Sequence, residues 1–200
     1  MKYLVHLYLA GDQPLRQLGS MMGDFVKGPV PSTYPAGIRL GLTLHRRIDS
    51  LSQISRNCRS SRRRIHPRFG HVRAIMVDIF YDHFLARDWH AYHAEPLEEY
   101  AARFYQVLQE QQRWLPPALA SIAPRMIERN WLVAYRQKAA VERALKHLAS
   151  RLSRPTLLGQ GLGELELHEA GLREDFSRFM VEAAKKTTVL CAEFVQTDDP

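Results

Sequence analysis

The chain has 200 residues, of which 46% are hydrophobic and 24% are charged. These proportions are those of a globular protein with a buried core, and they exclude an intrinsically disordered chain. The formal net charge of +7 favours an acidic partner, whether nucleic acid, an anionic membrane or an acidic protein.

Neither a disulfide framework nor a membrane segment is expected. The two cysteines, Cys58 and Cys191, lie far apart in the chain and are read as free thiols of a reducing compartment. The apolar stretch at residues 1–10 is short, contains His6 and is followed by no evident small-residue cleavage site, which argues against a signal peptide. No stretch approaches the roughly 18 apolar residues of a membrane span. We therefore expect a soluble cytoplasmic protein.

Segments with helical periodicity are common in this chain and strand patterns are scarce, which predicts an all-α fold. The whole chain, 1–200, is expected to form a single helical domain with a frayed end at 197–200. Glycines and prolines predict loops at 28–37 and 154–163, and Pro116-Pro117 predicts the end of a helix. The expected helices cover residues 13–26, 38–57, 74–89, 97–115, 130–152 and 164–193, with Gly171 as a candidate break in the last one.

The segment 74–89 is apolar nearly all round, which is typical of a buried helix. It contains two acidic residues, Asp78 and Asp82, whose spacing of four places them on one helix face. Two buried carboxylates repel each other and are costly to desolvate, so a positive group must compensate them. That group is either a divalent cation or an arginine from residues 56–73, and the sequence leaves both open.

Several further histidines and carboxylates are candidates for the same site. His45 and Asp49 are four residues apart, so they can bind one metal ion or form a surface ion pair of little energetic weight. His83 follows Asp82 directly and is a further candidate for this site. A single buried histidine is, however, more often a core residue. Asp24 adjoins a glycine, which is typical of a turn residue. His6, taken alone, is weak evidence for a functional site.

Taken together, these residues favour a metal site without thiolate ligands. Histidine and carboxylate ligands suit Mn²⁺, Mg²⁺, Fe²⁺ or Zn²⁺. Such ions generate hydroxide near neutral pH and stabilise a phosphoryl transition state. The chain has no Walker loop, no Gly-x-Ser-x-Gly motif and no His-Glu-x-x-His motif, and the glycines at 159–163 follow no predicted strand, which argues against a dinucleotide site.

Residues 56–73 contain seven arginines and no acidic residue. This stretch is a solvated face, a phosphate-binding site or a docking face for an acidic protein, and arginine suits phosphate because it binds it bidentately. Phe69 is its only aromatic residue, so stacking on single-stranded nucleic acid is not favoured.

Several segments resemble the bacterial acyl carrier protein phosphodiesterases, in the same order along nearly the whole chain. The family is regarded as a distant branch of the HD-type metal phosphohydrolases, so the resemblance implies a helical bundle with a divalent metal, Mn²⁺ first. One departure is that the HD signature has a His-Asp doublet, whereas this chain has Asp82-His83. The matching segments are residues 1–10, Gly23-Asp24-Phe25-Val26-Lys27-Gly28, Gly41-Leu42-Thr43-Leu44-His45-Arg46-Arg47-Ile48-Asp49, Val77-Asp78-Ile79-Phe80-Tyr81-Asp82-His83-Phe84-Leu85, and residues 130–136 and 149–151.

The resemblance implies hydrolysis of the phosphodiester that links 4'-phosphopantetheine to a serine of holo acyl carrier protein. The products would be apo acyl carrier protein and 4'-phosphopantetheine. Arg46 or Arg47 would neutralise charge on the phosphate, and His83 or His6 would protonate the leaving oxygen. The implied metal ligands are a subset of Asp24, His45, Asp49, Asp78, Asp82 and His83, and the catalytic candidates are Asp24, His45, Arg46, Arg47, Asp78, His83 and His6.

An acyl carrier protein is acidic, so the basic stretch gains a role as the face that docks it. No nucleic-acid or membrane partner is then expected. Two alternatives stay open, namely a metal phosphodiesterase acting on a nucleotide or other small phosphate ester, and a non-catalytic nucleic-acid-binding helical protein that would leave Asp78 and Asp82 unexplained. The predicted docking residues are Arg59, Arg62, Arg63, Arg64 and Arg68.

Overall fold

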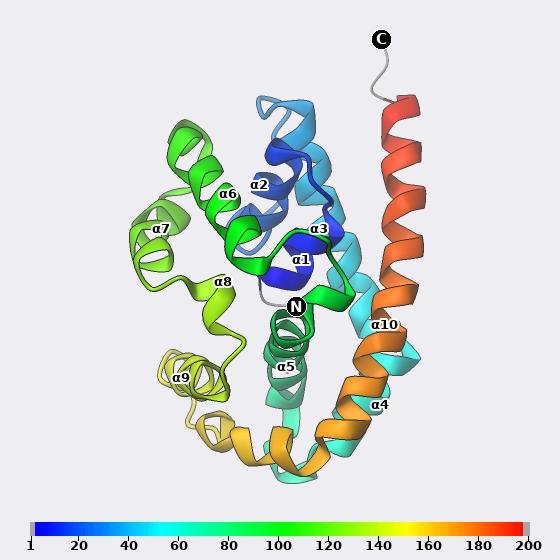
Figure 1. The fold of residues 1–200 in the computed structure, drawn as a ribbon, viewed down its shortest axis with the longest axis vertical. Helices are drawn as coiled ribbons and strands as arrows, with labels where there is room; N and C mark the ends of the chain where they lie inside the picture. Colours follow the sequence, from blue (N-terminus) through cyan, green and yellow to red (C-terminus); the bar gives the residue numbers. More distant parts are fainter. Residues whose placement is uncertain (1–2, 198–200) are drawn as a thin grey trace.

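Helices build all of the architecture in residues 3–197, the part of the chain that the computed structural model describes (Figure 1). This range contains no strand, so the predicted all-α class is confirmed. Residues 198–200 of the expected frayed end lie outside the described range. The α-helices are α1 (Leu4–Leu9), α2 (Pro14–Met22), α3 (Ala36–Ile54), α4 (Arg56–Arg64), α5 (Arg73–Arg87), α6 (Leu97–Glu110), α7 (Pro117–Glu128), α8 (Trp131–Ala134), α9 (Lys138–Ala149) and α10 (Leu162–Thr197).

Short 3₁₀ helices connect several of these elements. They are η1 (Pro67–Val72), η2 (Trp89–Ala91), η3 (Gln112–Trp114) and η4 (Leu158–Gln160). Helix α5 lies at the centre of the core, packed against α1, α9 and α10. Phe80, Tyr81 and Phe84 of this helix are completely buried, as its continuous apolar sequence predicts.

Helices α2 and α3 pack against each other at unusually short range because both contribute glycine to the contact. A Cβ atom on Gly41 would lie 2.1 Å from the carbonyl oxygen of Arg16, and one on Gly19 would lie 2.1 Å from that of Ile38. Any larger residue would push the two backbones apart. The glycines therefore fix the position of α3, which carries four candidate site residues, His45, Arg46, Arg47 and Asp49.

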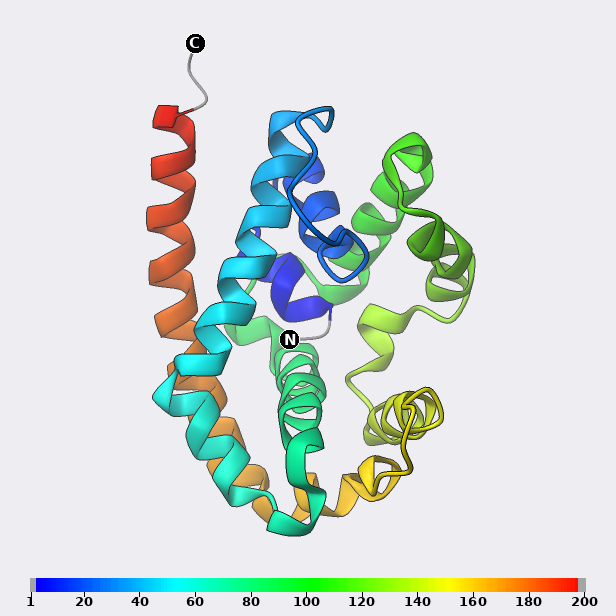
Figure 2. The same ribbon diagram turned by 180° about the vertical axis from the view of Figure 1, so that it is seen from behind.

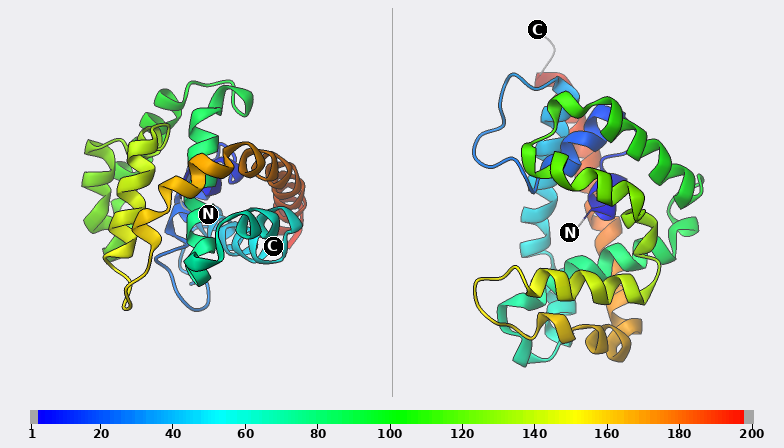
Figure 3. Two further views of the ribbon diagram at one scale, coloured as in Figure 1. Left: turned by 90° about the horizontal axis from the view of Figure 1, so that it is seen from below. Right: turned by 90° about the vertical axis from the view of Figure 1, so that its left-hand side faces the viewer.

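Helix α10 runs along one side of the molecule, and its first half lies beside α4 and α5 (Figures 1 and 2). The end-on view shows α10 and α4 on one side of α5 and the α7–α9 segment on the other (Figure 3). The candidate break at Gly171 does not occur, since α10 is continuous through it. A Cβ atom on Gly171 would lie 2.4 Å from the Arg64 guanidinium, so this glycine gives room to an arginine of α4.

Two helix boundaries differ from the sequence prediction for identifiable reasons. Pro117 begins α7, a helix that the sequence did not predict. A proline fits at this position because the N–H groups of the first helical turn have no partner within the helix. The predicted helix over 130–152 is divided into α8 and α9. The turn between them exposes the carbonyl of Tyr135, which accepts a hydrogen bond from His83.

None of the described helices combines the length and the hydrophobicity that a membrane span requires.

The close contact between α2 and α3 predicts that Gly41→Ala destabilises the protein. The added methyl group meets backbone atoms, which cannot rotate away, so we expect a loss of about 1–3 kcal/mol in the free energy of unfolding. Gly163→Ala is the matched control, because a Cβ atom there would meet nothing within 4 Å. Thermal unfolding should show a lower Tm for Gly41→Ala alone, and equal Tm values for both variants would contradict the packing argument.

Candidate active site

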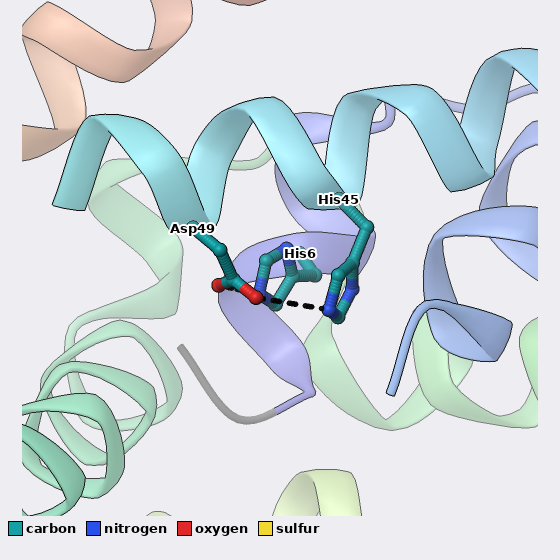
Figure 4. Close-up of side chains that lie close together, drawn as sticks. All are labelled: His6, His45 and Asp49. Atoms are coloured by element: carbon teal, nitrogen blue, oxygen red, sulfur yellow. Dashed lines mark ion pairs between the residues drawn. The ribbon is translucent and has the colours of Figure 1, made fainter. Parts of the chain in front are cut away.

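Two histidines and one carboxylate converge between α1 and α3 (Figure 4). His6 extends from α1, whereas His45 and Asp49 extend from one face of α3. Nε2 of His6 lies 3.1 Å from Oδ1 of Asp49, and Nε2 of His45 lies 3.2 Å from Oδ2. One potential ligand atom from each residue lies within 4.8 Å of the other two. The histidines are buried and the Asp49 side chain is 43% exposed, so the cluster meets solvent at its carboxylate.

One residue of α2, Ser20, contacts both histidines. Its hydroxyl donates to the backbone carbonyl of His6 at 3.0 Å, and its own carbonyl accepts from Nδ1 of His45 at 2.8 Å. A carbonyl can only accept, so Nδ1 of His45 carries a proton and Nε2 is directed toward Asp49. Gly23 leaves the space for this ring, because a Cβ atom there would lie 2.1 Å from it.

Burial and charge set the protonation of the cluster. Burial, together with the neighbouring His45, lowers the pKa of His6 to about 3. Burial also acts to lower the pKa of His45, but Asp24 and Asp49 outweigh it and raise that pKa. For Asp49, burial opposes ionisation, yet the imidazoles of His45 and His6 hold its pKa well below the usual range. The site thus contains an ionised carboxylate beside a neutral imidazole, which are the forms that bind metal ions.

Two more of the predicted carboxylates lie near this cluster. Oδ1 of Asp24, in the turn after α2, is 3.7 Å from Nε2 of His45. Burial raises the pKa of Asp78 on α5, and the negative charges of Asp49 and Asp24 add to that rise. Asp78 is thus coupled electrostatically to these two carboxylates, although it is not among the three residues whose ligand atoms converge. The structure brings His45 and Asp49 together with His6, which the sequence suggested only as a proton donor, and places Asp24 beside His45.

Asp82 has a different environment from the one expected of a metal ligand. Its side chain is completely buried, and its two oxygens accept hydrogen bonds from the backbone N–H groups of Tyr3, Leu4 and Val5 at 2.6, 3.0 and 3.2 Å. Burial raises the pKa of this carboxyl, and the three N–H donors oppose that rise. Asp82 thus caps the start of α1, the helix that carries His6, from outside that helix.

His83 is also engaged away from the cluster. Its Nδ1 donates to the carbonyl of Tyr135 at 2.7 Å, and its buried Nε2 has no hydrogen-bond partner in the described residues. Burial lowers the pKa of His83 although the Tyr135 carbonyl favours its protonated form. Of the candidate arginines beside the site, Arg46 donates to the carbonyl of Val26 at 3.0 Å, and Arg47 is exposed.

The basic stretch forms α4 and η1 and divides into two kinds of arginine. Arg64 pairs with buried Asp175 at 2.8 Å, and Arg68 lies 3.8 Å from Glu164. These two charges are compensated within the protein. Arg62 instead donates to the carbonyls of Ser52 and Gln53, and Arg59 donates to that of Ile54, so both keep their positive charge uncompensated.

The fold and the cluster define an all-helical protein with a histidine–carboxylate centre. The family model for acyl carrier protein phosphodiesterase matches residues 1–183. The chain is 31% identical to the acyl carrier protein phosphodiesterase of Klebsiella pneumoniae over 187 residues, which cover 90% of this chain and 93% of the relative. It is 29% identical to that of an Enterobacter species over 191 residues, 93% and 99% of the two chains. No solved structure gives a significant match.

The chain therefore belongs to the acyl carrier protein phosphodiesterase family, and it is an enzyme, as the resemblance implied. Its relationship to HD-type phosphohydrolases stays a prediction.

The role of Asp82 as a cap predicts a stability effect that needs no metal. In the presence of EDTA, Asp82→Asn should lower the free energy of unfolding by roughly 2–3 kcal/mol, because the charged acceptor of three buried N–H groups is lost. Glu98→Gln, which removes one surface ion pair with Arg136, is the control and should cost less than about 1 kcal/mol. Denaturant unfolding measures both. If Asp82→Asn unfolds like the wild type without metal, Asp82 does not act as a cap.

Proposed function

We propose that this enzyme hydrolyses the phosphodiester between 4'-phosphopantetheine and a serine of holo acyl carrier protein, using a divalent cation held by His6, His45 and Asp49. The names of its relatives support the substrate. The convergence of three potential ligand atoms within 4.8 Å supports the metal site, and it is the observation that carries the proposal.

The residues at the cluster fit a divalent cation. Two imidazole nitrogens and a carboxylate form a donor set suited to Mn²⁺, which we place first, or to Fe²⁺, Zn²⁺ or Mg²⁺. Both ring nitrogens of His6 are buried and have no partner in hydrogen-bond geometry within residues 3–197, even though Nε2 is close to Asp49. A metal ion would supply a partner for one of these nitrogens. Asp24 and Asp78 stay candidates for additional ligands, whereas the capping role of Asp82 and the position of His83 make these two weaker candidates.

The proposed hydrolysis assigns separate roles to the cation, to His6 and to Asp78. A bound cation of this kind lowers the pKa of water and offsets charge on phosphoryl oxygens. Water attacks phosphorus, the bond from phosphorus to the serine oxygen breaks, and that oxygen receives a proton. His6 is a poor proton donor because its pKa is too low, so its role is that of a ligand. Asp78 has a raised pKa, so it is a candidate to hold the transferred proton only where it is not itself a ligand of the cation.

The hydrogen bond between Arg46 and the Val26 carbonyl gives this arginine a second role in the proposal. It ties α3 to the loop that follows Asp24, and this loop borders the cluster. Arg47 is exposed and follows His45 by two residues, which places it about 200° around α3 from His45 and directs it away from the cluster, so Arg46 is the better candidate to offset charge on a bound phosphate.

The proposal predicts metal-dependent release of phosphopantetheine by the wild type. Incubation with holo acyl carrier protein and Mn²⁺ should convert the carrier to its apo mass, as read by intact-mass spectrometry, and EDTA should stop the conversion. Asp49→Asn should lower kcat by about 100-fold or more, because it removes the negative charge of the carboxylate ligand that lies between the two imidazoles.

Asp12→Asn is the matched control for that substitution. Asp12 also faces a histidine, His93 at 3.4 Å, but it is 67% exposed and lies outside the cluster. This variant should keep the wild-type rate. A folded wild-type enzyme that leaves holo carrier intact with Mn²⁺, Mg²⁺, Fe²⁺ and Zn²⁺ would refute the proposed reaction.

A further inference from the structure

A cationic hollow of about 300 Å³ opens between α4 and the start of α5. No acidic residue lines it. Gly70 lies at its wall with a positive φ of 51°, a conformation that glycine adopts without strain. His71 is one of the lining residues, and the side chains that give the hollow its charge are Arg59, Arg62, Arg63 and Arg73.

Backbone carbonyls rather than carboxylates hold these arginines. Arg62 donates to Ser52 and Gln53, and Arg73 donates to Gly70 at 2.9 Å and Arg62 at 3.4 Å. A carbonyl fixes a guanidinium group but does not cancel its charge. Arg63 is exposed and has no ion pair or hydrogen bond among the described residues. Four like charges therefore surround one hollow, and their repulsion would be relieved by a bound anion.

Two helices, α3 and α5, connect the surroundings of the hollow with candidate residues of the site. The carbonyls of Ser52 and Gln53, which hold Arg62, belong to the turn of α3 that follows Asp49. Ala74, which lines the hollow on α5, comes one turn before Asp78. One turn advances a helix by about 5.4 Å, so the α5 edge of the hollow begins about one turn from Asp78, and the α3 carbonyls that hold Arg62 lie about one turn beyond Asp49.

Building on the proposed function, we propose that this hollow is the seat for carboxylate side chains of the acyl carrier protein, next to the serine whose phosphodiester enters the cluster. Arg59, Arg62, Arg63 and Arg73 then orient the carrier, whereas Arg64 and Arg68, which have carboxylate partners within the chain, maintain the fold. The proposed docking face thus omits two of the predicted docking residues, Arg64 and Arg68, and adds His71 and Arg73 from the same basic stretch.

The test uses a double charge reversal at two exposed arginines of the hollow, Arg59→Glu with Arg63→Glu. The control reverses two exposed arginines elsewhere, Arg125→Glu with Arg154→Glu, so that the net charge changes equally. Thermal unfolding first checks that both variants fold. Binding of apo carrier protein is then measured by titration calorimetry, and KM and kcat are measured with holo carrier at two salt concentrations.

We expect the hollow variant to weaken apo-carrier binding and to raise KM by about tenfold or more at low salt, with kcat within about twofold of the wild type. Its residual binding should depend less on salt, and the control should behave like the wild type. Unchanged binding and KM in the hollow variant would overturn the inference, as would an equal effect of both variants. A loss of kcat at constant KM would show that the hollow acts on the phosphate instead.

The two readouts separate this inference from the proposed function. Apo carrier has no scissile bond, so its binding reports on the hollow alone. If the wild type binds apo carrier through the hollow but does not cleave holo carrier, the proposed reaction fails and the docking site stands. If the wild type cleaves holo carrier and the hollow variant binds and cleaves it equally well, only the docking site fails.

Discussion

The buried carboxylate of Asp82 is the contact on which the site depends. Helix α1 has six residues and no side-chain cap of its own, and a helix of that length is not stable in isolation. Asp82 of the central helix α5 accepts hydrogen bonds from its first backbone N–H groups and so fixes where α1 begins. His6 lies on that helix, and its imidazole reaches Asp49 only because α1 is held there. The helix that forms the core thus also positions one of the site's histidines.

Charge is distributed unevenly around this centre, and the distribution matches the two binding events that the proposals require. Asp24 and Asp49 lie beside the histidines, where the proposed cation would bind. Arginines gather at a separate hollow between α4 and α5, where neutral carbonyls hold Arg59, Arg62 and Arg73 and leave their charge available to an acidic partner. The net charge of +7 alone did not show this separation.

How much the sequence predicts depends on whether the partners lie close along the chain. The spacing of His45 and Asp49 correctly placed both side chains on one helix face, and the apolar sequence of α5 correctly predicted its burial. The sequence leaves a metal ion or an arginine as the group that compensates the charge of Asp82. The structure instead supplies the backbone N–H groups of Tyr3, Leu4 and Val5. No local pattern indicates such a partner. Likewise, composition identified the basic stretch, but only the fold reveals that Asp175 and Glu164 compensate Arg64 and Arg68.

The measurement that tests the central claim most directly is Mn²⁺ binding, followed by electron paramagnetic resonance, in the wild type, His6→Ala and His83→Ala. Free Mn²⁺ gives a signal that binding diminishes, so the titration needs no turnover. The account predicts that the wild type and His83→Ala bind Mn²⁺ alike and that His6→Ala binds it at least about tenfold more weakly. If His6→Ala binds Mn²⁺ as the wild type does and His83→Ala does not, the metal centre lies at His83, and the cluster of His6, His45 and Asp49 is not the active site.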